Sequence, residues 1–232
     1  MNATVSRPVI EAQKVLMGLL ERRRREMGLD RQPTVDEFYP VNVEDILYKM
    51  GWHIERVPMV GHTEDFLPAD GKVDFDEMTI TIEARGNVPK GRTNWTLAHE
   101  LGHIVLHGKE GQRTLLRTRS MRRKHTGIMQ RDPLDVEADR FAAELLMPSK
   151  AVKIKFREFL QCNEITVVSN RANQICSIGH PGRISEPLSR GSLARTIATY
   201  QSEATGPSLV TFFEVSVEAM TTRLLELGIV LD

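Results

Sequence analysis

Residues 95–103 read Trp-Thr-Leu-Ala-His-Glu-Leu-Gly-His and contain the pattern His-Glu-x-x-His. Two histidines four positions apart on a helix lie one turn apart on the same face, so both imidazoles can bind one metal ion. The glutamate after the first histidine can then act as a general base on a water molecule at that metal. The pattern therefore predicts His99 and His103 as metal ligands and Glu100 as the catalytic base.

The residues around this motif favour a helix. Thr93 or Asn94 is a suitable N-cap, and Gly108 is a suitable end. The alternative is a buried amphipathic helix whose histidines bind nothing, and the complete motif in a helical context makes that the weaker interpretation. His107 lies one turn further along the same face, but a site with two histidines from one helix usually takes its third ligand from elsewhere. We therefore expect His107 to be a packing residue or to support a ligand.

A second helix is predicted over residues 134–147, between a proline at 133 and another at 148. Asp135 and Asp139 stand four apart at the edge of its apolar face, so both can meet the first helix. Asp135 is the predicted third ligand, and Asp139 the predicted acceptor of a hydrogen bond from a ligand histidine. Glu137 is the rival ligand because its side chain is longer, but it lies about 200° around the helix from Asp135. A solvated helix face is the alternative for all three acids.

Two segments carry a resemblance to a known family. One is Thr-Leu-Ala followed by His-Glu-Leu-Gly-His at 96–103, and the other is Glu-Ala-Asp-Arg-Phe-Ala-Ala-Glu-Leu-Leu-Met-Pro at 137–148. In this order they resemble the ImmA/IrrE family of metallo-endopeptidases, over about Pro40 to Lys155 and again near the C-terminus. The resemblance implies an α+β fold with a zincin-like core, in which a small sheet packs on helices, and a C-terminal helical subdomain.

The resemblance also implies a zinc ion as cofactor and an acidic third ligand at the position of Asp135. The family usually has glutamate there, so the shorter carboxylate must bring its helix closer or bind the metal less tightly. The implied activity is cleavage of a regulatory protein, commonly a helix-turn-helix repressor, which controls stress or mobile-element genes. We expect such a repressor to be a separately encoded partner.

Two other functions are open at this point. One is a non-proteolytic regulatory or toxin–antitoxin partner protein that keeps the metal fold for binding, and Asp135 in place of glutamate is the feature that supports it. The other is a DNA-binding protein that acts through the arginine-rich segments at 21–26 and 113–125. Because 31 basic and 31 acidic residues give a formal charge of zero, we expect no direct nucleic-acid binding.

The composition limits the class of protein. The 232 residues are 41% hydrophobic and 27% charged, which is ordinary for a globular protein with one core and an accessory segment. We find no window that is apolar enough to cross a membrane, and the N-terminus lacks the apolar region of a secretory signal. Cys162 and Cys176 are too few for a disulfide framework. A cytoplasmic protein is therefore expected.

We predict three parts in the chain: an N-terminal helix and connector at 1–38, a zincin-like metallopeptidase domain at 39–155, and a mainly helical subdomain with a loop-rich insertion at 156–232. Further elements are helices at 7–27, 43–50, 150–161 and 193–200, two short helices within 209–231, and strands at 53–57 and 73–83. The strand before the metal helix is either a sheet edge that aligns an extended peptide or a core strand.

Overall fold

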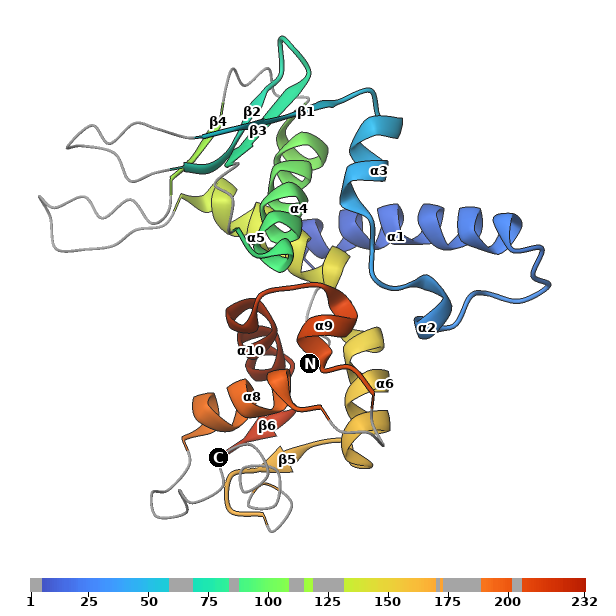
Figure 1. The fold of residues 1–232 in the computed structure, drawn as a ribbon, viewed down its shortest axis with the longest axis vertical. Coiled ribbons are helices and arrows are strands. Elements are labelled where there is room, and N and C mark those ends of the chain that lie inside the picture. The colour runs from blue at the N-terminus through green and yellow to red at the C-terminus, as the bar shows by residue number, and fades with distance from the viewer. Residues whose placement is uncertain are drawn as a thin grey trace, which may run out of the picture. The chain divides into compact units, whose positions relative to one another are not determined.

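The computed structural model describes residues 6–58, 69–83, 88–108, 115–118, 132–169, 172, 189–201 and 206–232. Helices and a small sheet make up the fold (Figure 1), which confirms a mixed α and β architecture. The chain divides into two compact units. The first comprises Met1–Glu21 and Asn42–Leu145, and the second comprises Arg22–Val41 and Leu146–Asp232. The three domain ranges given above stay a prediction.

A four-stranded sheet lies in the first unit. Its strands are β1 (His53–Val57), β2 (Ala69–Asp74), β3 (Thr79–Glu83) and β4 (Leu115–Thr118), in the order β1-β3-β2-β4. β1 pairs parallel with β3, while β2 pairs antiparallel with both β3 and β4. β3 is therefore an inner strand, and its Ile80 and Ile82 are buried. The prediction of a sheet edge here is wrong, and the core-strand interpretation holds.

The single strand predicted over 73–83 is instead a β-hairpin. The carboxylate of Asp74 accepts hydrogen bonds from the backbone N–H groups of Asp76 at 3.1 Å and Glu77 at 3.2 Å. Such bonds stabilise a turn. Met78 then has a φ of 48°, which directs the chain back into β3. β4 pairs with β2 and was not predicted, because its segment was interpreted only as part of a basic cluster.

α4 (Lys90–His107) packs against β2 and β3 of this sheet. The helix begins after Pro89, whose carbonyl accepts hydrogen bonds from the N–H groups of Arg92 and Thr93. Thr93 and Asn94 thus lie inside the helix, and the prediction that one of them is the N-cap is wrong. The predicted end at Gly108 is confirmed.

Three more helices belong wholly or mainly to the first unit: α1 (Arg7–Glu26), α3 (Val43–Lys49) and α5 (Pro133–Leu146). They confirm the helices predicted at 7–27, 43–50 and 134–147. The guanidinium of Arg7 on α1 donates to the carbonyl of Leu106 at 2.7 Å, and the amide of Gln13 donates to Glu144 of α5 at 3.1 Å. The first turns of α1 are thereby attached to both α4 and α5.

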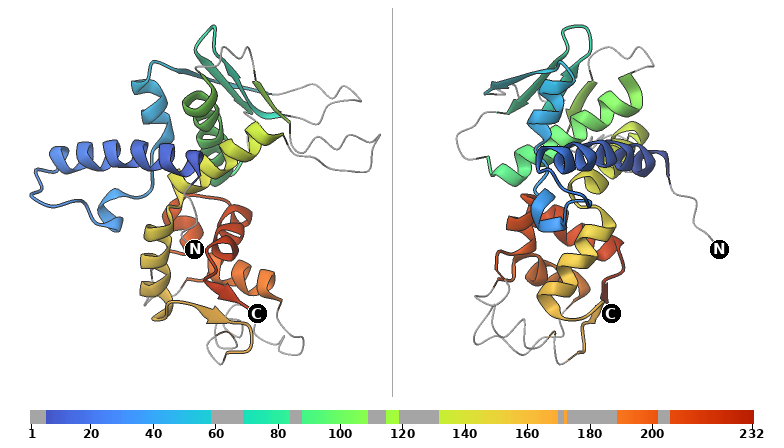
Figure 2. Two further views of the ribbon diagram at one scale, coloured as in Figure 1. Left: turned by 180° about the vertical axis from the view of Figure 1, so that it is seen from behind. Right: turned by 90° about the vertical axis from the view of Figure 1, so that its right-hand side faces the viewer.

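The second unit is mainly helical. Its elements are α2 (Val35–Phe38), α6 (Ser149–Leu160), β5 (Ile165–Thr166), α8 (Arg190–Thr199), α9 (Leu209–Phe213), α10 (Val217–Glu226) and β6 (Val230–Leu231). Figure 2 shows α6, α8, α9 and α10 as one group of helices. The helices predicted at 150–161, at 193–200 and within 209–231 are confirmed, whereas the short parallel pair of β5 and β6 was not predicted. Among the described helices, none combines the length and apolar character of a membrane span.

Candidate metal centre

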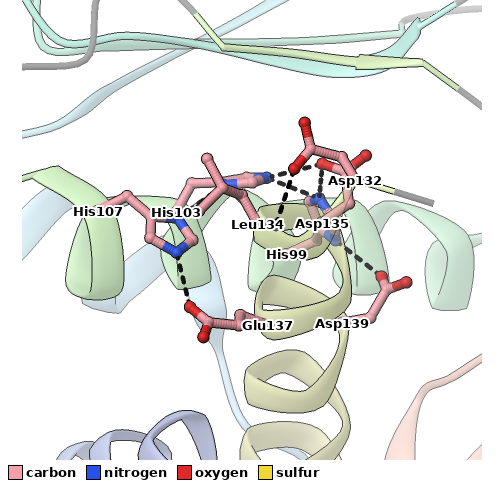
Figure 3. Close-up of polar contacts among 8 residues, drawn as sticks. All are labelled: His99, His103, His107, Asp132, Leu134, Asp135, Glu137 and Asp139. Carbon is pink, nitrogen blue, oxygen red and sulfur yellow. Dashed lines mark hydrogen bonds and ion pairs between the residues drawn. The ribbon is translucent and has the colours of Figure 1, made fainter. Parts of the chain in front are cut away.

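Three histidines of α4 form a row on the face that meets α5 (Figure 3). His99, His103 and His107 are spaced four residues apart, and each is at most 2% exposed. Nε2 of His99 lies 2.9 Å from Nε2 of His103, and Nδ1 of His103 lies 3.1 Å from Nδ1 of His107. The row follows from helix geometry, since residues four apart lie one turn apart on the same face. Leu97 and Leu101 are fully buried on another face of the helix.

Asp135 of α5 approaches the first two histidines. Its Oδ1 lies 3.4 Å from Nε2 of His103 and 3.8 Å from Nε2 of His99. One oxygen and two nitrogens therefore lie within 4.8 Å of one another. Donor atoms around a tetrahedral zinc ion are about 3.3 Å apart, as follows from metal–ligand distances near 2.0–2.1 Å. The observed separations of 2.9, 3.4 and 3.8 Å bracket that value, so these residues fit a metal ion.

Asp139 lies on the far side of His99 from this cluster. Its Oδ1 accepts a hydrogen bond from Nδ1 of His99 at 2.8 Å. An imidazole that donates from Nδ1 has a lone pair on Nε2, which is the nitrogen that faces His103 and Asp135. The structure thus places Asp139 where the sequence predicts a residue that orients a ligand.

Glu137 points to a different histidine. Its Oε2 lies 3.0 Å from Nε2 of His107, while Asp135 lies beside His99 and His103. Figure 3 shows the two acids on different sides of α5. The geometry therefore favours Asp135 over Glu137 as the third donor, and it places His107 in contact with His103 outside that trio.

Burial and the contacts within the cluster shift the pKa values of Asp135 and His103. Burial would raise the pKa of Asp135, but its interactions with His103 and His99 outweigh burial and lower that pKa well below its usual range. Burial lowers the pKa of the His103 imidazole, and the contact with Asp135 offsets only part of this effect. An ionised carboxylate next to a neutral imidazole is the protonation state that a metal ion requires of its ligands.

Glu100 follows His99 on α4 and is fully buried. Its carboxylate lies against β2 at Gly71, where a Cβ atom would come within 2.7 Å of Oε1 of Glu100 and 2.7 Å of Cγ2 of Thr96. Any side chain at position 71 would therefore displace this carboxylate. The sequence analysis did not single out Gly71, because nothing in the sequence shows which strand residue lies over α4.

Gly102 is the second residue that the sequence analysis missed. A Cβ atom there would lie 3.1 Å from Cα of Ala138 and 3.2 Å from its carbonyl oxygen. The backbones of α4 and α5 therefore cross closely at this point. The crossing brings the short side chain of Asp135 within reach of the imidazoles. A closer approach of this helix was one of the two consequences that we expected from aspartate in place of glutamate.

A comparison with protein families identifies the family of this chain. Residues 49–168, just over half of the 232 residues, match the family model of peptidase M78, described as the IrrE N-terminal-like domain. The chain belongs to the peptidase M78 family. The resemblance to ImmA/IrrE metallopeptidases is thereby confirmed, and family membership indicates a peptidase whose centre takes a metal. A search of curated proteins finds no match.

The M78 match contains both α4 and α5, and so every residue of the cluster. Most of the predicted basic segment at 113–125, including His125, lies outside the described residues.

Proposed function

We propose that this M78 protein is a zinc-dependent endopeptidase with a zincin-like core and a C-terminal helical subdomain. The observation that carries the proposal is the convergence of His99 Nε2, His103 Nε2 and Asp135 Oδ1, with Glu100 buried one residue after His99 on α4. Two imidazoles and one carboxylate are the protein donors of many catalytic zinc sites in peptidases. Zinc fits this mixed nitrogen and oxygen set, and its identity is part of the proposal.

A divalent cation at this centre would supply Lewis acidity that polarises a peptide carbonyl and a water molecule. Glu100 directly follows His99 on α4, and in this proposal its carboxylate takes a proton from the attacking water and passes it to the leaving amine. Asp139 holds the ring of His99 through the bond to Nδ1. Gly71 leaves room for the carboxylate of Glu100 beneath β2.

The proposed substrate is a regulatory protein, namely a separately encoded helix-turn-helix repressor, and the proposed location is the cytoplasm. The ImmA/IrrE resemblance supports this substrate class. Within the described sheet the outer strands are β1 and β4, and an extended peptide could pair with either one. Cleavage of such a repressor would switch on stress or mobile-element genes.

The test compares zinc-loaded wild-type protein with a Glu100→Gln variant. Each is incubated with a purified helix-turn-helix repressor encoded beside this gene and, separately, with unfolded casein as a general substrate. We expect the wild type to cleave the repressor and the variant to leave it intact, while both bind zinc equally because Glu100 is not one of the three donors.

The outcomes separate the parts of the proposal. Cleavage by both proteins contradicts the catalytic role of Glu100. If neither protein cleaves either substrate, the proposed endopeptidase activity is contradicted. Zinc binding without any cleavage favours the non-proteolytic binding partner. Cleavage of casein alone rejects the repressor as substrate but keeps the peptidase.

A further inference from the structure

The polar contacts of α4 and α5 form one continuous chain that runs from Asp139 to Glu137. It has four links: Asp139 to His99 at 2.8 Å, His99 to His103 at 2.9 Å, His103 to His107 at 3.1 Å, and His107 to Glu137 at 3.0 Å. Each link that is a hydrogen bond needs one hydrogen atom. When the three imidazoles are neutral and the two carboxylates are ionised, each imidazole supplies one N–H and the carboxylates supply none. One of the four links must therefore lack a hydrogen.

The chemistry of the two ends decides which link this is. A carboxylate only accepts, so Nδ1 of His99 and Nε2 of His107 must each carry the hydrogen of their imidazole. Nε2 of His99 and Nδ1 of His107 are then bare acceptors. The single hydrogen of His103 can serve only one of its two neighbours. When it lies on Nδ1 and is donated to His107, the bare Nε2 atoms of His99 and His103 face each other.

Two lone pairs 2.9 Å apart repel each other unless a cation lies beside both. Oδ1 of Asp135 approaches these same two Nε2 atoms. The missing hydrogen and the three converging donor atoms thus mark one position. The chain of contacts is complete when a metal ion occupies that position.

We propose that Glu137 and His107 are positioning residues that hold His103 in the tautomer that presents Nε2 to the metal. Glu137 accepts from Nε2 of His107, and Nδ1 of His107 accepts from Nδ1 of His103. Asp139 does the same for His99 in a single step. The inference rests on the proposed metal centre and assigns a role to the third histidine of the row. Since His103 and His107 are 2% and 1% exposed, water cannot easily replace the link between these two rings.

The test measures the affinity for zinc and for cobalt(II) in wild-type protein and in the variants Glu137→Ala, Glu137→Gln and Glu144→Gln. Loss of a residue that orients a metal ligand typically weakens binding by about 10–100-fold, and we expect about tenfold for Glu137→Ala because it acts through His107. Glutamine can still accept from His107, so Glu137→Gln should stay close to wild type. Glu144 lies two turns further along α5 and accepts from Gln13, so Glu144→Gln controls for the loss of an acid from this helix.

Long-range nitrogen–proton NMR spectra of the zinc-loaded wild type give a second readout. We expect the hydrogen of His103 on Nδ1 and that of His107 on Nε2. A hydrogen on Nδ1 of His107, or equal affinities in wild type and Glu137→Ala, overturns the inference and leaves the metal centre intact. Equal losses in Glu137→Gln and Glu137→Ala also overturn it, because the charge of Glu137 would then matter and not its hydrogen bond. If the wild type binds neither metal, the proposed centre fails and the positioning role fails with it.

Discussion

A Gly102→Ala substitution probes the close crossing of α4 and α5. The added Cβ atom would lie 3.1 Å from Cα of Ala138 and 3.2 Å from its carbonyl oxygen, whereas ordinary van der Waals contact begins at 3.4 Å. Both neighbours are backbone atoms, so no side-chain rotation relieves the overlap. The two helices must separate by at least about 0.3 Å, and a well-packed interior resists such a shift.

Two opposing effects set the size of the change in unfolding free energy. Overpacking of this kind costs about 1–3 kcal/mol, whereas replacing glycine by alanine inside a helix stabilises a protein by about 0.5–1 kcal/mol. Gly18→Ala in α1 is the matched control, because it has the same helix effect and its Cβ atom meets nothing within 4 Å. The two variants should therefore differ by about 1–3 kcal/mol in unfolding free energy, with Gly18→Ala the more stable. At about 2–4 °C per kcal/mol, the melting temperatures should differ by about 2–12 °C.

Zinc affinity measured by chelator competition gives a second readout of the same substitution. Separation of the helices moves Asp135 away from His99 and His103, so Gly102→Ala should bind zinc about tenfold more weakly than wild type. Gly18→Ala should bind as wild type does. If Gly102→Ala were as stabilising as Gly18→Ala and bound zinc equally well, the helix crossing would not determine the geometry of the centre.

Three further substitutions test other parts of the structure. Gly71→Ala places a Cβ atom 2.7 Å from Oε1 of Glu100, so kcat should fall about 100-fold while the affinity for zinc changes little. Equal losses of kcat and of zinc affinity would refute this. Asp135→Ala should abolish stoichiometric zinc by elemental analysis, and retained zinc would reject Asp135 as a ligand. The hydrogen bond with Arg31 lowers the pKa of Glu37 from 4.5 to about 2, so this carboxylate stabilises the fold above pH 4.5 and ceases to do so as pH falls towards 2. The difference in melting temperature between wild type and Glu37→Gln should close over that range, and a difference independent of pH would contradict it.

The helices that build the centre could be predicted because their sequence patterns are long and regular. In α5 the apolar residues 138, 141, 142, 145 and 146 repeat at helical spacing, and all of them are buried. The same spacing put Asp135 and Asp139 on one face, and in the structure Asp135 lies beside His99 and His103 while Asp139 lies beside His99. Local periodicity determines which residues share a face, and so it also separated Glu137 from Asp135.

The sheet was harder to predict because strand limits and strand order depend on contacts distant in sequence. Alternating residues on both sides of Asp74 hid the turn between β2 and β3. β4 is four residues long, and β5 and β6 are two residues each, which is too short for a periodic signal. Whether β3 is an inner strand depends on its pairing with both β1 and β2, which no local pattern shows.

The contact between Gly102 and Ala138 explains how the acids of α5 are distributed among the histidines of α4. Successive helix residues are rotated by about 100°, so with Ala138 at the crossing Glu137 and Asp139 lie about 100° to either side. Asp135 lies about 60° towards the Asp139 side, which is why it meets His103 and His99 while Glu137 meets His107. Had Asp139 stood at the crossing instead, Glu137 would point about 200° away from α4 and lose its contact. The helix patterns provide the faces, but one backbone contact, made possible by the missing Cβ atom of Gly102, determines which acid serves which imidazole.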